Sequence, residues 1–219
     1  MTSPLPLGVL VSGSGTNLQA IIDGIESGRI PAEIRLVICN RPNAAALQRT
    51  DRHRVPSEIV DHREFASREA FDGHVVGLLR DRGVELVCLA GFDRLLSPTF
   101  IRAFPERILN VHPALLPSFP GLHAQRQALE YGVRIAGATV HIVDEKTDHG
   151  PIVIQAAVPV YSDDSAEAVA DRILAEEHRI YPEAICLFAE GRVRVEGRRV
   201  RILGEEPLAD RALVNPALG

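Results

Sequence analysis

An amide and an imidazole two residues apart, Asn110 and His112, give the strongest chemical signal in this chain of 219 residues. They follow an apolar run, and residues two apart on a strand project to the same face of a sheet. Open α/β sheets bind ligands at the carboxyl ends of their parallel strands. There the two side chains would offer donors to a developing oxyanion and a group that titrates near neutral pH. A hydrogen-bonded core histidine that caps the strand end explains the spacing equally well.

A glycine-rich turn, Ser12-Gly-Ser-Gly-Thr-Asn17, stands between an apolar strand pattern and a helical pattern. Free N–H groups and the helix dipole at the start of a helix attract phosphate, and glycines let it approach closely. The turn lacks the lysine of a Walker A loop, the acidic ribose partner of a dinucleotide fold and the GxSxG pattern of a hydrolase. We favour phosphate binding over the alternative, a tight turn in which Thr16 or Asn17 caps the helix.

A polar segment between two strands and a single glutamate on a helix are further candidates for a functional role. The segment Asp144 to Pro151 joins two strand patterns, and one of its carboxylates could orient an imidazole, although a solvated turn is the simpler explanation. Glu177 falls on the apolar stripe of a long helix, where a buried carboxylate needs a partner such as a ligand hydroxyl or amine. A pair with an arginine or with His178 explains it equally well. The histidines show no spacing typical of a metal site, so we expect no metal.

Strand and helix patterns alternate along the first half of the chain. Apolar strand patterns cover residues 7–11, 34–39, 56–60 (weakly), 84–90 and 107–111, and helical patterns follow the glycine-rich turn to Ser27 and cover 67–82. Near-continuous apolar strands between helices predict a mostly parallel central sheet flanked by helices on both faces, a Rossmann-like α/β fold.

The order of helix and strand patterns differs in the second half of the chain. The patterns predict a helix over 123–131, strands over 136–143 and 151–160, and a long helix over 164–190 that kinks at Pro182. A terminal hairpin over 192–202 turns at Glu196-Gly197. No linker interrupts the chain, so we expect a single domain over 1–219 with a core of about 7–191 and a terminal hairpin and tail over 192–219.

The composition argues against two classes of partner. A net charge of −5 provides no basic footprint for nucleic acid or an anionic membrane. No apolar run approaches the about 18 residues of a membrane span, and residues 1–7 do not read as a signal peptide. Cys39, Cys88 and Cys186 lie far apart beside apolar residues, so we expect buried thiols and a cytoplasmic protein.

A set of motifs along the chain is shared with a known enzyme family. The motifs are Ser12-Gly-Ser-Gly-Thr-Asn-Leu-Gln-Ala-Ile-Ile22, Leu89-Ala-Gly-Phe92, Ile108-Leu-Asn-Val-His-Pro-Ala-Leu-Leu-Pro117, Pro120-Gly-Leu-His123 and Asp148-His-Gly-Pro151. In order and spacing they resemble the phosphoribosylglycinamide formyltransferases, folate-dependent enzymes of purine synthesis. The Asn-x-His-Pro-x-Leu-Leu-Pro segment is specific to the formyltransferase superfamily, and the likeness extends from about Leu7 to Gly191.

The resemblance implies an activity and a set of site residues. The enzyme would transfer a formyl group from 10-formyltetrahydrofolate, a co-substrate, to the amine of 5-phosphoribosyl-glycinamide (GAR), with no metal and no tightly bound cofactor. The implied catalytic residues are Asn110, His112 and Asp148; GAR would be held by Gly15, Thr16, Asn17 and Glu177; and the folate by Arg68, Asp93, Arg94, Leu95, Leu96, Asn110, His141 and Asp144. Its partners would be these small molecules only, and the chain would be a monomer or a homodimer.

Two positions depart from the family pattern, and three other functions compete. Asp93 stands where an apolar residue, commonly Met, lines the folate pocket, and His149 stands where a small residue is usual. Methionyl-tRNA formyltransferase shares the central motif, but this acidic chain has no room or charge for its tRNA-binding domain. A formyltetrahydrofolate hydrolase would use water in place of the amine. A non-catalytic folate or nucleotide binder would have no need of an acid–base set.

Overall fold

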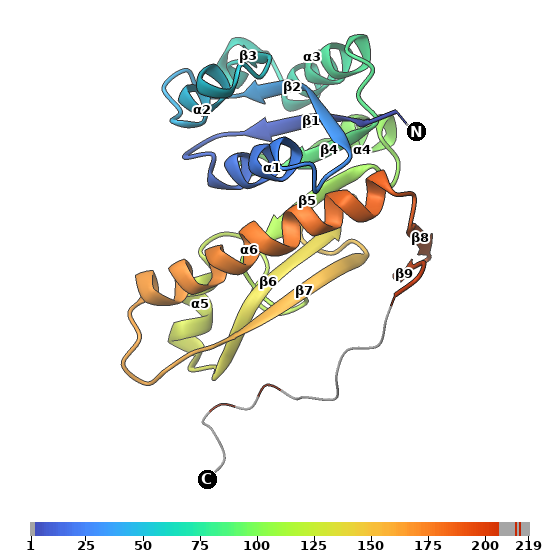
Figure 1. The fold of residues 1–219 in the computed structure, drawn as a ribbon. Helices are drawn as coiled ribbons and strands as arrows, with labels where there is room; N and C mark the ends of the chain where they lie inside the picture. The colour runs from blue at the N-terminus through green and yellow to red at the C-terminus, as the bar shows by residue number, and fades with distance from the viewer. Residues whose placement is uncertain (1–2, 206–212, 214, 216–219) are drawn as a thin grey trace.

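The central sheet has seven strands and is mostly parallel, as the sequence predicts. The structure, a computed structural model, describes residues 3–205, 213 and 215. The strands are β1 (Leu5–Val11), β2 (Ala32–Cys39), β3 (Ser57–Ile59), β4 (Leu86–Leu89), β5 (Ile108–His112), β6 (Ile135–Ile142) and β7 (Ile152–Pro159). Their order is β3-β2-β1-β4-β5-β6-β7, and β6 pairs antiparallel with both of its neighbours (Figure 1).

Helices cover both faces of this sheet and bury a core against each. The helices α1 (Thr16–Glu26), α5 (Ala124–Tyr131) and α6 (Ala166–Ala189) pack on one face, and α3 (Arg68–Asp81) and α4 (Pro98–Ala103) on the other. The strands supply both cores because successive residues of a strand point to opposite faces. In β5, Leu109 and Val111 belong to the first core and Ile108 to the second, so Asn110 and His112 share the face of Ile108.

Three short elements have no counterpart in the sequence patterns: α2 (Ala46–His53), α4 and the 3₁₀ turn η1 (His62–Glu64). Only Ala46 and Thr50 of α2 are buried, so this helix shows no apolar stripe. Helix α4 has six residues, too few for a helical period to be recognised. The long helix predicted over 164–190 forms as α6, and it continues through Pro182 to Ala189.

The terminal hairpin forms, but its turn lies one residue later than predicted. Strand β8 (Val193–Glu196) and strand β9 (Arg199–Ile202) leave Gly197 and Arg198 as the turn residues. Gly197 has a φ of 62°, the positive value that the first central residue of a tight hairpin turn requires.

Two of the three cysteines are buried, as the sequence predicts. Cys39 and Cys88 are buried, but Cys186 is only half-buried because it lies beside the buried stripe of α6, next to the Arg29 carbonyl. In the described part of the chain, no helix has the length and apolar character that crossing a membrane requires.

The strand order reverses between β1 and β4. From β1 the chain moves outward to β2 and β3, and it then returns to β4 on the other side of β1. The carboxyl ends of β1, β4 and β5 therefore meet beside a topological switch point, where open α/β sheets bind their ligands.

Candidate active site

Two neighbouring strands bring an amide and two imidazoles together. Asn110 and His112 lie on β5, and the antiparallel register sets His141 of β6 opposite Asn110. The Asn110 Nδ2 atom is 3.2 Å from His141 Nε2. Both histidines are almost fully buried, with exposed fractions of 5 % for His112 and 2 % for His141. The predicted pair on β5 is thus accompanied by a third polar side chain from the adjacent strand.

Asp148 reaches the same cluster from the loop between β6 and β7. Its Oδ2 atom lies 3.5 Å from His112 Nδ1 and its Oδ1 atom 3.7 Å from His141 Nε2. The Gly121 N–H also donates to Oδ2 at 2.8 Å. Partial burial disfavours the Asp148 carboxylate, but its contacts with His141, Gly121 and His112 outweigh burial and lower its pKa. The structure therefore joins Asn110, His112 and Asp148 in one site.

The orientation of the His112 ring follows from its acceptors. Nε2 lies 2.8 Å from the Phe119 carbonyl oxygen, which can only accept, so Nε2 carries a proton and donates it. Nδ1 then faces the Asp148 carboxylate. A second proton at Nδ1 would give an imidazolium with a carbonyl on one side and a carboxylate on the other, which is an arrangement suited to acid–base chemistry.

Thr139 of β6 holds the loop that follows His112. The Thr139 hydroxyl donates to the Ala114 carbonyl at 2.7 Å and accepts from the Leu116 N–H at 3.1 Å. Gln155 of β7 donates to the Leu116 carbonyl and to the Thr139 hydroxyl, both at 3.0 Å. Sequence reasoning missed this support, whose only signal is a threonine in a strand that is apolar apart from Thr139 and His141.

The glycine-rich turn ends in a helix start without a side-chain cap. Helix α1 begins at Thr16, and Gly15 occupies the cap position with a φ of 69°. The alternative in which Thr16 or Asn17 caps the helix is therefore wrong, because both lie inside the first turn. The first intrahelical hydrogen bond runs from the Gln19 N–H to the Gly15 carbonyl. The backbone N–H groups that precede Gln19 point outward from the helix start and can bind an anion.

Helix α2 supports this turn from behind. The Ala46 N–H donates to the Gly13 carbonyl at 3.1 Å, and Arg49 Nε donates to the Ser14 carbonyl at 2.9 Å. A Cβ on Gly15 would lie 2.7 Å from the Ala46 Cβ, so the close packing of α2 as well as the positive φ requires glycine.

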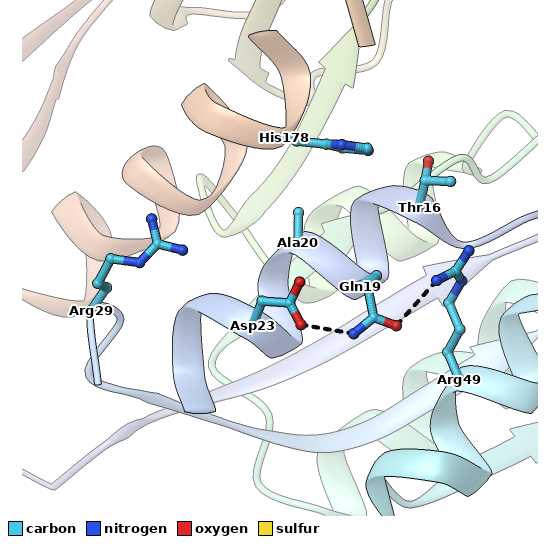
Figure 2. A pocket seen from close by; sticks show the side chains of 7 residues that line it. All are labelled: Thr16, Gln19, Ala20, Asp23, Arg29, Arg49 and His178. Atoms are coloured by element: carbon cyan, nitrogen blue, oxygen red, sulfur yellow. Dashed lines mark hydrogen bonds between the residues drawn. The ribbon is translucent and has the colours of Figure 1, made fainter. Parts of the chain in front are cut away.

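A cavity of about 260 Å³ opens beside the start of α1 (Figure 2). Its lining residues are Thr16, Gln19, Ala20, Asp23, Arg29, Arg49 and His178. Two arginines against one aspartate make its charge favourable for an anion. Burial and the nearby Arg49 charge lower the pKa of His178, and Asp23 partly opposes this effect. Sequence reasoning missed Arg49, which sits on the unpredicted helix.

Glu177 pairs with the helix start and not with an arginine or His178. It is buried, and its Oε2 atom accepts a hydrogen bond from Asn17 Nδ2 at 2.8 Å. Burial raises the pKa of Glu177, and the hydrogen bond from Asn17 offsets part of that rise. The Oδ1 atom of Asn17 is also buried, and it has no hydrogen-bond partner among the described residues. Two polar side chains thus meet beside the glycine-rich turn, and the Asn17 Oδ1 atom can still accept a hydrogen bond.

The segment that follows β4 presents both polar and apolar groups. The Asp93 carboxylate accepts from Asn40 Nδ2 at 3.0 Å and pairs with Arg41, while its backbone N–H donates to the Ser12 hydroxyl. Burial disfavours this carboxylate, but the hydrogen bonds from Asn40, Ser12 and Arg41 outweigh burial and lower its pKa. The side chain of Asp93 is thus engaged with the end of β2.

The remaining residues implied for the folate lie in that segment, at the start of α3 and in the β6–β7 loop. The Arg94 guanidinium lies 5.3 Å from the centre of the Phe71 ring on α3, and exposed Arg68 begins the same helix. Leu95 is 59 % exposed, and Leu96 packs against the core. Asp144 lies in the β6–β7 loop, where its carboxylate is bonded within the loop.

Comparison with known proteins places the chain among enzymes of one kind. A family model described as formyl transferase matches residues 7–185. Phosphoribosylglycinamide formyltransferase of Escherichia coli is 42 % identical over 187 residues, which cover 85 % of this chain and 88 % of that protein. The trifunctional purine biosynthetic protein adenosine-3 of Drosophila melanogaster is 45 % identical over 185 residues, but the chain spans only 14 % of its length.

Solved structures agree with these sequence matches. Glycinamide ribonucleotide transformylase 1 from Symbiobacterium toebii superimposes with a TM-score of 0.91 at 57 % identity, covering 93 % of this chain and 96 % of that one. Phosphoribosylglycinamide formyltransferase from Anaplasma phagocytophilum gives a TM-score of 0.86 at 40 % identity, covering 94 % and 97 %. All of these matches confirm the resemblance carried by the sequence motifs.

Proposed function

The chain belongs to the formyl transferase family, and from this membership we propose that it transfers a formyl group from 10-formyltetrahydrofolate to the amine of GAR. The products would be formyl-GAR and tetrahydrofolate, in the synthesis of purines. The observation that carries the proposal is the cluster of Asn110, His112 and Asp148 at the carboxyl end of β5. A protein that only binds these ligands has no need of a carboxylate beside two imidazoles, one of which contacts an amide.

The reaction needs no covalent enzyme intermediate. The glycyl amine of GAR, with a pKa of about 7.7–8.0 as for an α-amino group, is nucleophilic near neutral pH. Its nitrogen attacks the formyl carbon, a C–N bond forms, and negative charge develops on the formyl oxygen. The C–N bond to the folate then breaks, and one proton passes from the attacking nitrogen to the leaving folate nitrogen.

The cluster supplies the donors and the proton relay for these steps. Asn110 and protonated His112 stabilise the developing oxyanion, and a preorganised donor of this kind contributes about 3–4 kcal/mol. The His112 Nε2–H, which is donated to Phe119 in this structure, turns to the formyl oxygen as the charge develops. Asp148 holds the other ring nitrogen and assists the proton transfer.

GAR would bind along the start of α1. The backbone at Gly15, Thr16 and Asn17 holds the phosphate, because free N–H groups and the helix dipole meet there. The basic cavity beside Thr16 supports this placement (Figure 2). Glu177 accepts hydrogen bonds from the ribose hydroxyls, since the Asn17–Glu177 pair retains free acceptor atoms.

The folate would bind between the segment after β4 and the β6–β7 loop. Exposed Leu95 with Leu96 offers an apolar surface to the ring system, and Arg94 and Arg68 offer positive charge to the carboxylates. Asp93 contributes its backbone, because its side chain is engaged by Arg41. On the other side, Asp144 contacts the ring. His141 and Asn110 contact the formyl-bearing end, since both belong to the catalytic cluster.

We also propose that one domain over 1–219 carries the activity in the cytoplasm, as a monomer or a homodimer. Its partners are small molecules, without a tightly bound cofactor, a metal, nucleic acid or a membrane. A single central sheet with a core on each face joins the described elements from β1 to α6, which supports a single domain.

A formyl-transfer assay tests the proposed function. Purified protein is mixed with 10-formyltetrahydrofolate, with and without GAR, while folate absorbance and formate release are followed. The expected result is tetrahydrofolate that appears only with GAR and without formate. Formate released in the absence of GAR would instead identify a hydrolase. Binding of both ligands without any turnover would identify a binding protein.

A further inference from the structure

The β6–β7 loop that carries Asp148 is closed by a contact within itself. The Asp144 Oδ1 atom accepts from the Lys146 N–H at 2.9 Å, which forms a tight turn at the start of the loop. The Oδ2 atom of the same carboxylate lies 2.9 Å from His149 Nδ1. Since a carboxylate only accepts, Nδ1 donates, and the two ends of the loop are tied to one another.

The C-terminal hairpin contacts the loop at His149, from the outer side. Arg198, in the turn between β8 and β9, places its Nη1 atom 3.0 Å from His149 Nδ1 and 3.2 Å from Nε2. Because Nδ1 donates its proton to Asp144, the ring atom that can accept from the Arg198 guanidinium is Nε2. The positive charge of Arg198 and the Asp144 carboxylate thus both contact the His149 ring. An electrostatic bridge therefore runs from the hairpin turn through His149 to the start of the loop.

Within residues 3–205, a cavity borders much of the outer side of the loop. This cavity of about 440 Å³ separates the loop and the hairpin from α4, and its wall includes Ile101, Val143 and Val195. A second outer contact, from Arg102 of α4 to Glu145, spans 3.7 Å between two exposed side chains. Exposed ion pairs at such distances contribute little. Arg198 and His149 are exposed as well, but at 3.2 Å from Nη1 to Nε2 theirs is the shorter of these two outer contacts among the described residues.

Asp148 directly precedes His149, so this support acts on its position. Asp148 has a φ of 48°, a left-handed conformation that a non-glycine residue keeps only when its surroundings fix it. Its carboxylate lies 3.5 Å from His112, just beyond ordinary hydrogen-bond length. Small movements of the loop therefore change this contact strongly.

We propose that Arg198 and His149 are positioning residues, which hold the β6–β7 loop so that the Asp148 carboxylate faces His112. The inference rests on the proposed function, in which Asp148 takes part in proton transfer. It extends the site to the C-terminal hairpin, an element outside the expected core. It also gives His149 a role at a position where the family usually has a small residue.

Steady-state kinetics of Arg198→Gln and His149→Gln test the inference, with Arg201→Gln as the matched control. Arg201 is exposed on the same hairpin and carries the same charge. Loss of one outer contact would lower kcat roughly three- to tenfold, since a small misplacement of a catalytic group lowers the reaction rate strongly. The KM for GAR stays unchanged, because the phosphate site lies at α1. Arg201→Gln leaves kcat at the wild-type value.

A double-mutant cycle separates positioning from a general loss of structure. In an Asp148→Asn background, Arg198→Gln has no further effect on kcat if Arg198 acts through the Asp148 carboxylate. An equal fold-loss in both backgrounds would overturn the inference, as would full kcat in both Arg198→Gln and His149→Gln. A fully active Asp148→Asn enzyme would overturn the role of Asp148 itself, and only that result bears on the proposed mechanism.

Discussion

His112 suits an acid–base reaction because its two ring nitrogens face two different acceptors. Nε2 donates to the Phe119 carbonyl, and Nδ1 faces the Asp148 carboxylate. In this structure the carbonyl and the carboxylate together orient the ring. Asn110 stands on the same face of β5 and shares a contact with His141. At the scale of residues, the site therefore consists of an oriented imidazole, a donor amide and a counter-charge.

Removal of either donor would slow formyl transfer without abolishing substrate binding. We expect Asn110→Ala and His112→Ala each to lower kcat by about 10²–10³-fold, the usual effect of losing an oxyanion donor. We expect the KM for GAR to change little, because the proposed phosphate site lies at α1. Steady-state kinetics with both substrates measure the effect, and His74→Ala, on the exposed face of α3, is the control. Unchanged turnover in a variant that binds both ligands would refute the catalytic assignment.

Glu177 couples function to stability in a pH-dependent way. Burial raises its pKa in the folded protein above that in the unfolded chain. Its stabilising contribution is therefore present below the unfolded pKa and is lost as the pH rises through the folded pKa. We expect Glu177→Gln to be more stable than the wild type at pH 8, with a difference that shrinks toward pH 4.

The same substitution would weaken GAR binding, because an amide replaces the charged acceptor. We expect the KM for GAR to rise about tenfold, in line with the loss of a hydrogen bond to a charged group. Urea unfolding at a series of pH values and steady-state kinetics give the two readouts. Glu183→Gln, on the exposed side of the same helix, should change neither. A stability difference that grows as the pH falls would contradict the assignment.

At the scale of elements, the glycine-rich turn depends on a helix that carries few apolar residues. Helix α2 reaches the turn through Ala46 and Arg49, and it packs so closely on Gly15 that no side chain fits there. The turn is thus shaped by three elements together, namely the end of β1, the start of α1 and the side of α2.

Gly15→Ala tests this arrangement against a control in the same turn. The substitution adds a methyl group 2.7 Å from Ala46 at a φ of 69°, which forces either the turn or α2 to move. We expect a loss of about 1–3 kcal/mol in the free energy of unfolding and a higher KM for GAR. At Gly13 a Cβ meets nothing within 4 Å, so Gly13→Ala should leave stability nearly unchanged. Equal stability of the two variants, by urea unfolding, would refute the packing argument.

At the scale of the whole molecule, helix α6 ties two central strands, β4 and β5, together. The buried Tyr181 hydroxyl lies 3.0 Å from the carbonyl oxygens of Leu89 in β4 and Leu109 in β5. One turn earlier along α6, Glu177 binds Asn17 at the start of α1. The same helix thus aligns β5, which carries the proposed catalytic pair, with the proposed phosphate-binding turn.

Tyr181→Phe would loosen this junction without touching the substrates. The single phenol proton is shared by two buried carbonyl oxygens, which would lose this donor, so we expect a loss of about 1–2 kcal/mol in the free energy of unfolding. Tyr131→Phe is the control, because the Tyr131 side chain is 80 % exposed. Thermal and urea unfolding give the comparison, and equal stability of both variants would contradict a structural role for the Tyr181 hydroxyl.

Much of the architecture can be predicted from local patterns. Apolar runs and helical stripes predict the strands from β1 to β7, the long helices and the two covered faces of the sheet. These patterns do not predict helix α2, because its burial comes from close packing on the glycine-rich turn and not from an apolar stripe. The hairpin turn shifts by one residue because the glycine, and not the polar residue before it, takes the positive φ.

The sequence by itself determined which side chains share a strand or a helix, because periodicity is a local property of the backbone. Asn110 and His112 on one face, and Glu177 on a buried stripe, follow from that alone. Only the tertiary structure decided what these groups meet. His141 faces Asn110 through antiparallel register, Asp148 reaches His112 through a loop that folds back, and Glu177 meets Asn17 across 160 positions of the chain. Strand order and helix packing set these contacts, and they depend on the burial of the whole core.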